Sequence, residues 1–539
     1  MNGPPLTIGW WLAATAPVAV LLVAVLGGRI RTQWAATGVL GLALVLGATA
    51  FRAGPVVLAT GLAKGLWLGL WILLVVWPAL LLYRLAQAGG LDDLGEIFTS
   101  ILPTRRENLL IVAWILPSFV QGVAGFGTPI AVTAPLLMAM GWSPVRAVAY
   151  PLIGYHWSVT FGSMGSSFYM ASLTASLDGA AQADLALRSA VLLGINCLVA
   201  GGLVLVLDGG LAALREGLRT LLLAGIPMAT TLIVVATAVP AVASLSAGAV
   251  GIGAAAAIAA HLSRRDRAAA TTPADDGDVD VTSSRDPSPA IPSRQERRRA
   301  AIIMAPYGYL LAIALPVFLL PATRAWVNTH ASLAPSFRAT STAWQWSNDA
   351  VEAYTPIDVF AHPGFYIFAA CALGFVTYRH AALVDVDGVG DLLAAWVRSL
   401  PAASASIVLL AALATVMTDT GMIAVLADGV AQGAGGLYPA LAPVVGGLGS
   451  FMTGSTTSSN ALFAALQADV AELLELPPSL LIAAQTAGGN AGNSLAPVII
   501  LVGATAVDAS DETASIMRFC LLPAGVLLAI VAALTLLGV

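Results

Sequence analysis

Long apolar runs recur along almost the whole chain, separated by short polar stretches. Most of these runs are near 20 residues long, which is the length an α-helix needs to cross the hydrocarbon core of a bilayer. The pattern predicts an all-α polytopic membrane protein with about twelve transmembrane helices. We place them near residues 8–28, 34–51, 58–85, 144–175, 186–208, 217–239, 242–262, 300–321, 361–379, 403–425, 478–508 and 515–538.

Two further segments, residues 107–140 and 439–472, do not fit as single crossings. Cytoplasmic loops are enriched in arginine and lysine. The arginine-bearing loops share one side only if each of these segments enters and leaves the membrane on the same face. We therefore expect two re-entrant hairpins, the first opening to the cytoplasm and the second to the outside, with both chain termini outside.

Each hairpin carries a polar, glycine-rich run, Gln121–Pro129 in the first and Thr453–Asn460 in the second. Hydrocarbon offers no hydrogen-bond partners to unpaired backbone N–H and C=O groups. A broken helix at membrane depth therefore occurs where it lines a cavity or is buried in protein. These runs therefore predict two hairpin tips beside a cavity in the membrane.

The same features occur in the same order in both halves of the chain. Ser118–Gly122 resembles Ser450–Gly454, and further on Gly162–Ser166 and Gly489–Asn493 share the pattern Gly, polar, any, Gly, polar. Because the two hairpins open to opposite faces, the halves form an inverted-topology repeat, as in many secondary transporters. The predicted organisation is a first repeat at 1–210 with hairpin 107–140 and broken helix 144–175, a connecting helix pair at 211–262, a flexible cytoplasmic loop at 263–299, and a second repeat at 300–539 with hairpin 439–472 and broken helix 478–508.

Composition agrees with this class. Hydrophobic residues make up 58% of the chain and charged residues 10%, against about 25% charged in a soluble domain. The cysteines Cys197, Cys371 and Cys520 are far apart, each in an apolar stretch, without metal or redox spacing. We predict no metal site, no cofactor and no nucleic-acid partner.

The four helix breaks predict a site for a small anion. Helix N-termini, backbone amides and small polar side chains around one cavity suit a carboxylate. The candidate substrate-binding residues are Gln121, Gly122, Gly125, Gly127, Thr128, Ser163, Ser166, Thr453, Ser455, Thr456, Ser458, Asn460, Asn490 and Asn493. Ionisable residues inside a membrane are costly and usually functional, which makes His156 the first candidate for coupling to a proton and Asp419 the second.

Two motifs resemble the L-lactate permease family: Gly-Phe-Gly-Thr-Pro at 125–129, and the Ser/Thr-rich run from Thr453 to Phe463 followed by Gln467. The spacing of the spans is also similar along nearly the whole chain. The resemblance implies a bacterial inner-membrane symporter that imports L-lactate or glycolate with protons, and an elevator-like mechanism. A homodimer is compatible with it. Gly154–Ser158 and Ser494–Ile500 depart from the family pattern, so another small carboxylate, bulkier or more aromatic than lactate, stays open.

Three other functions remain open from the sequence. A sodium-coupled carrier of another organic acid needs only carbonyl and hydroxyl ligands. A membrane-embedded hydrolase would use Ser163 with His156, but this pairing shows no oxyanion arrangement. A channel or sensor is the third alternative. We expect a transporter rather than an enzyme.

Overall fold

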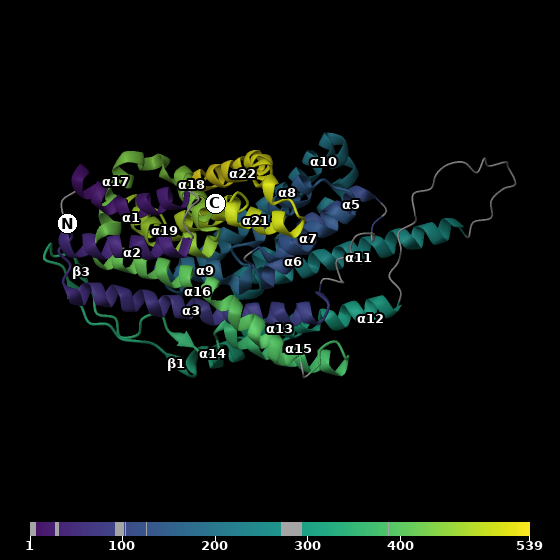
Figure 1. Cartoon of the computed structure of the whole chain (residues 1–539), viewed down its shortest axis with the longest axis horizontal. Coiled ribbons are helices and arrows are strands. Elements are labelled where there is room, and N and C mark those ends of the chain that lie inside the picture. Colours follow the sequence, from purple (N-terminus) through teal and green to yellow (C-terminus); the bar gives the residue numbers. More distant parts are fainter. Residues whose placement is uncertain are drawn as a thin grey trace.

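The computed structural model is built almost entirely of helices, with a small strand region on one side (Figure 1). It describes residues 7–26, 32–91, 102, 104–125, 127–270, 294–385 and 388–539. The first half contains α1 (Ile8–Leu26), α2 (Thr32–Thr49), α3 (Pro55–Ala88), α5 (Arg105–Leu110), α6 (Leu116–Val123), α7 (Thr128–Ala139), α8 (Pro144–Tyr155), α9 (Ser166–Thr174), α10 (Gly179–Ala238) and α11 (Ala243–Ala270). The second contains α12 (Arg294–Ile303), α13 (Ala305–Leu319), α14 (Pro321–Thr329), α15 (Pro363–His380), α16 (Val389–Asp419), α17 (Met422–Ala434), α18 (Tyr438–Thr453), α19 (Thr456–Leu473), α20 (Pro478–Asn493), α21 (Pro497–Ala506) and α22 (Thr513–Leu536).

The first expected hairpin consists of two helical arms that meet near Gly125. The π-helical turn η1 (Ile111–Ile115) joins α5 to α6, and α7 forms the returning arm. Gly127 has a φ of +86°, a value that glycine adopts without strain, and Pro129 stands in the first turn of α7, where its missing N–H costs nothing. In the second half, α18 and α19 are separated only by Gly454 and Ser455.

Both expected broken helices are interrupted, but the second breaks later than the sequence pattern suggested. The first runs from α8 through the 3₁₀ turns η2 (His156–Ser158) and η3 (Ser163–Gly165) to α9. In the second, Gly489–Asn493 is helical as the end of α20, and the break lies at residues 494–496.

Close packing explains the glycines of α20. A Cβ at Gly488 would lie 2.0 Å from the carbonyl oxygen of Pro443, and one at Gly492 would lie 2.0 Å from that of Gly447. Both carbonyls belong to α18. These glycines therefore let α18 and α20 touch, which is the role of small residues in membrane helix packing.

The described residues contain fewer long spans than the sequence predicted. Five helices are long and apolar enough to cross a membrane, or six if the bent pair of α12 and α13 counts as one span. The arms of the hairpins and broken helices are too short to qualify or, in the 18-residue α19, not apolar enough, and α1 and α2 are short apolar helices. The 60 residues of α10 count once, although Gly209 and Gly210 break the helix between the two expected spans.

A small cap covers the N-terminal end of α3. It contains α14 and the short strands β1 (Ser332–Leu333), β2 (Thr340–Ser341), β3 (Ser347–Asn348) and β4 (Ile357–Asp358). The strands pair antiparallel as β1 with β4 and β2 with β3. In Figure 1, the cap strand β3 lies beside the N end of the chain, whereas α11 extends to the opposite end of the molecule.

Candidate functional site

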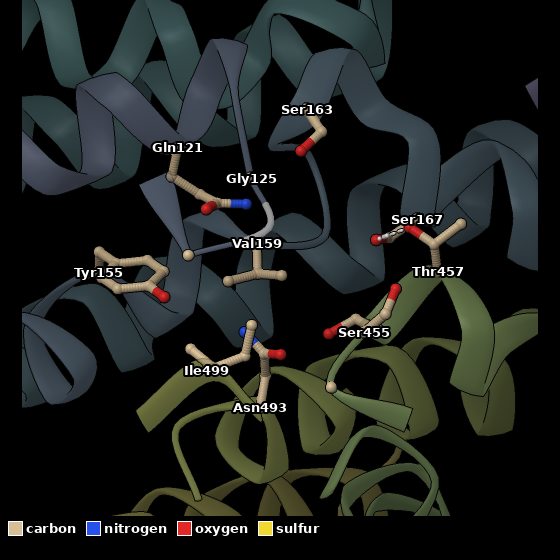
Figure 2. A pocket seen from close by; sticks show the side chains of 13 residues that line it. Gln121, Gly125, Tyr155, Val159, Ser163, Ser167, Ser455, Thr457, Asn493 and Ile499 are labelled. Carbon is tan, nitrogen blue, oxygen red and sulfur yellow. Dashed lines mark hydrogen bonds between the residues drawn. The ribbon is translucent and has the colours of Figure 1, made fainter. Parts of the chain in front are cut away.

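One polar cavity lies where the two hairpin tips and the two broken helices meet (Figure 2). The cavity itself is narrow, with a volume of about 20 Å³, and it lies within a recess of about 350 Å³ that includes open space at its mouth. Its lining residues are Gln121, Gly125, Gly127, Tyr155, Val159, Ser163, Ser167, Gly454, Ser455, Thr456, Thr457, Asn493 and Ile499. Segments more than 300 residues apart in the sequence therefore build one site, since Gln121 and Asn493 both belong to it.

The tip of the first hairpin lies against the first broken helix. A Cβ at Gly125 would lie 2.4 Å from the hydroxyl oxygen of Ser163, so only glycine permits this approach. Ser163 has a φ of 46° and Met164 a φ of 56°, the left-handed region that L-residues seldom occupy. Figure 2 shows the Ser163 hydroxyl directed toward the Gln121 amide side of the cavity. Such backbone strain is typical of binding sites.

The tip of the second hairpin is stabilised by its own side chains. Ser455 caps α19, and its hydroxyl accepts a hydrogen bond from the Ser458 amide at 3.3 Å. Thr453 donates to the carbonyl oxygens of Gly449 at 2.8 Å and Ser455 at 2.9 Å. Gly454 has a φ of +68°. The turn is therefore fixed before any ligand binds.

The cavity offers hydrogen-bond donors and carries no charged side chain among the lining residues. Helices α7, α9 and α19 begin at or next to lining residues, and the lining residue Ile499 lies in the first turn of α21. The free N–H groups and the dipole of a helix N-terminus favour negative charge. The electrostatics of the cavity thus suit a small anion.

The structure brings half of the predicted binding residues to the cavity wall. Those that line it are Gln121, Gly125, Gly127, Ser163, Ser455, Thr456 and Asn493. Those outside the lining are Gly122, Thr128, Ser166, Thr453, Ser458, Asn460 and Asn490.

The residues outside the lining hold its elements together. A Cβ at Gly122 would lie 2.6 Å from the Leu245 backbone, so this glycine packs α6 against α11. Thr128 donates its N–H to the Gly125 carbonyl at 3.2 Å, and the hydroxyl of Ser166 lies 3.3 Å from that of Thr457.

Asn460 and Asn490 belong to a buried network beneath the cavity. Asn460 donates to the Ser167 carbonyl at 2.9 Å and to the Thr486 hydroxyl at 2.8 Å. Asn490 accepts from the Thr160 hydroxyl at 3.0 Å. These side chains join the first broken helix to the second half of the chain.

Six lining residues are additional to the predicted set: Tyr155, Val159, Ser167, Gly454, Thr457 and Ile499. Ser167, Gly454 and Thr457 adjoin predicted residues in the same polar runs, so the runs themselves are the signal for them. Tyr155 and Ile499 lie in the two stretches that depart from the family pattern, and both line the cavity. Nothing in the sequence around Val159 indicated that it would line the cavity.

The two coupling candidates have different surroundings. His156 is 1% exposed, its Nδ1 lies 2.9 Å from the Ile153 carbonyl, and its Nε2 has no partner. Asp419 lies outside the cavity, where its Oδ1 is 2.9 Å from Nζ of Lys64. His156 follows the lining residue Tyr155, whereas Asp419 ends α16 beside the cap.

The chain resembles known permeases along most of its length. It is 26% identical over 525 residues to a glycolate permease of Escherichia coli K12, covering 94% of this chain and 92% of that protein. It is 24% identical over 537 residues to an L-lactate permease of Bacillus subtilis 168, with the same coverages of 94% and 92%. The crystal structure of the Alcanivorax borkumensis YdaH transporter aligns with a TM-score of 0.45 at 15% identity, covering 86% of this chain and 84% of that one.

The permeases among these relatives are transporters and not enzymes, which confirms the expected class. Together with the apolar helices, they identify a multi-pass membrane transport protein. A family model described as L-lactate permease matches residues 11–539, and the chain therefore belongs to the L-lactate permease family.

Proposed function

We propose that this protein is a secondary active transporter that imports L-lactate, or a related small monocarboxylate such as glycolate, by proton symport across the bacterial inner membrane. The observation that carries the proposal is the cavity at the four helix breaks, which presents hydroxyls, amides and helix N-termini but no charged side chain. Such a site neutralises one carboxylate by dipoles. The relatives, a glycolate permease and an L-lactate permease, supply the substrate class.

The substrate would lie between polar and apolar walls. Gln121, Ser163, Ser455 and Asn493 offer hydrogen bonds, while Val159 and Ile499 offer apolar surface for the carbon chain. Tyr155 narrows one side of the cavity (Figure 2). This arrangement supports a short carboxylate with one small substituent.

The two halves are proposed to form an inverted repeat that works in an elevator-like manner. Each half has a hairpin followed by a broken helix, and both contribute to the same cavity. Substrate sites of inverted-repeat transporters lie at such junctions of discontinuous helices. Together with the arginine distribution of the loops, this arrangement supports an outside position for both termini.

Proton coupling is assigned to His156 in this proposal. A carbonyl oxygen can only accept, so Nδ1 of His156 donates to Ile153 and the lone pair of Nε2 is left free. A neutral imidazole with one free nitrogen can take up a proton. Asp419 is the second candidate, but its bond to Lys64 makes it a member of an ion pair remote from the cavity lining.

Uptake of labelled L-lactate into proteoliposomes tests the proposal. We expect an inward proton gradient to accelerate uptake and unlabelled glycolate to compete. Replacing His156 by Gln should abolish acceleration by the gradient while counterflow of lactate persists. Asp419→Asn is the comparison: if it, and not His156→Gln, uncouples transport, the assignment passes to Asp419.

Sodium coupling is the alternative outcome. If uptake responds to an inward sodium gradient and not to a proton gradient, the protein is a sodium-coupled carrier and the role of His156 is wrong. Absence of saturable uptake and of counterflow for lactate and glycolate would overturn the substrate assignment.

A further inference from the structure

A continuous chain of hydrogen bonds runs beneath the cavity and crosses between the two halves of the protein. It starts at the Ser167 carbonyl, which accepts from Asn460, and continues to the Thr486 hydroxyl at 2.8 Å from Asn460 Nδ2. The Thr486 hydroxyl lies 3.0 Å from that of Thr160. Thr160, Thr486, Asn460 and Asn490 are each 0% exposed.

The direction of this chain is fixed by chemistry at its Asn460 end, and from Thr486 to Asn490 it is the direction in which each hydroxyl donates its one proton onward. Asn460 must donate to the Ser167 carbonyl, which places its nitrogen there, and Gln485 donates to its oxygen at 3.0 Å. Thr486 accepts from that nitrogen, which leaves its own proton for Thr160. Thr160 in turn donates to Asn490 Oδ1 at 3.0 Å. The Asn490 amide is therefore oriented with its nitrogen at the free end of the chain.

Two unpaired atoms lie where the chain approaches the cavity. Asn490 Nδ2 is a buried donor without a partner, and Asn493 Oδ1 is a buried acceptor without a partner. Residues three apart on a helix are neighbours, so a small rotation or one bridging water would join these atoms. Asn493 lines the cavity, and turning its oxygen toward Asn490 leaves its NH₂ group for a ligand.

We propose that Thr160 and Thr486 are positioning residues for substrate binding. Through Asn490 they hold the Asn493 amide with its N–H groups toward the cavity, so that the site presents a donor and not an acceptor to a carboxylate. An oxygen facing the substrate would instead repel it. This inference rests on the proposed function, because it assumes that the cavity binds a carboxylate.

Binding of L-lactate to the full-length protein in nanodiscs, measured by isothermal titration, tests the role of Thr160. Valine has nearly the shape of threonine but cannot donate, so Thr160→Val should weaken binding about tenfold, the effect of one hydrogen bond to a charged group. Thr160→Ser keeps the hydroxyl and should restore wild-type affinity. Thr535→Val is the control, because this buried threonine bonds only to Val531 of its own helix.

A double-mutant cycle separates positioning from simple support of the fold. If Thr160 acts through Asn493, Thr160→Val combined with Asn493→Ala should bind no more weakly than Asn493→Ala alone. The variants Thr486→Val and Thr486→Ser repeat the binding test at the second hydroxyl of the chain. They replace the Thr160 variants if one of those does not fold.

The outcomes distinguish the two proposals. Wild-type affinity in both valine variants, or additive losses in the double variant, would overturn the positioning role while leaving the transporter assignment intact. If the wild-type protein binds neither lactate nor glycolate, the proposed function itself fails and this inference with it.

Discussion

The buried ion pair of Lys64 and Asp419 shows how charged residues enclosed by apolar helices can serve structure. The two side chains join α3 to α16 at 2.9 Å and are 10% and 4% exposed. Nζ of Lys64 also lies 6.0 Å from the centre of the Phe337 ring and 5.9 Å from that of Tyr354, both in the cap. The pair therefore links two long helices and the cap above them.

Removing the charge of Lys64 alone should lower the stability of the fold more than removing the charges of both Lys64 and Asp419. Lys64→Met leaves a buried carboxylate unpaired, which destabilises a protein by about 3–5 kcal/mol. Adding Asp419→Leu should recover most of the loss, because well-packed apolar residues replace a buried pair at little cost. The apparent Tm in detergent measures both effects. Arg188→Met, which breaks a more exposed pair with Asp184, is the control, and an equal loss there would contradict the argument.

At the scale of elements, close packing explains glycines in the helices that follow the two hairpins. Gly488 lies opposite a carbonyl of α18, and Gly154 has the corresponding place in the first half, where a Cβ would lie 2.0 Å from the Ala113 carbonyl. In both halves the helix after the hairpin packs this way on the outgoing hairpin arm. The similarity supports the proposed repeat.

Substitution of Gly488 should therefore disrupt α18 and α20 together. Gly488→Ala puts a methyl group into the Pro443 backbone, a case of overpacking that typically costs about 1–3 kcal/mol and more against rigid backbone. Yield of monodisperse protein and apparent Tm should both fall. Gly525→Ala in α22 meets nothing within 4 Å and should be tolerated. Equal behaviour of the two variants would refute the packing role.

For the whole molecule, the cap and the distal part of α11 mark opposite ends. Trp10 of α1 lies 5.4 Å from Trp344 of the cap, which fixes the N-terminal helix beside it. The distal part of α11 lies at the other end in Figure 1. An outside position for the N-terminus thus requires an outside cap.

Labelling of single cysteines in intact cells tests this orientation. The native Cys197, Cys371 and Cys520 are buried, so their background reaction should be low. A membrane-impermeant maleimide should label the exposed Glu352→Cys directly and the exposed Arg294→Cys only after permeabilisation. The reverse pattern would show that both termini are inside.

The sequence alone determined the class of protein and most helix positions. Apolar runs and breaker residues act locally, since the bilayer demands helices of a given length and proline and glycine interrupt them. The Gln121–Pro129 and Thr453–Asn460 runs thus marked both hairpin tips, and half of the predicted residues line the cavity.

Tertiary structure decided which polar residues face the cavity and which face each other. Thr160 and Thr486 are 326 residues apart, and nothing local in either predicts their hydrogen bond. The pairing of Lys64 with Asp419 and the packing of Gly488 likewise depend on a partner helix distant in the chain. The sequence determines the chemistry of each side chain, but the packing of the helices determines which residue it contacts.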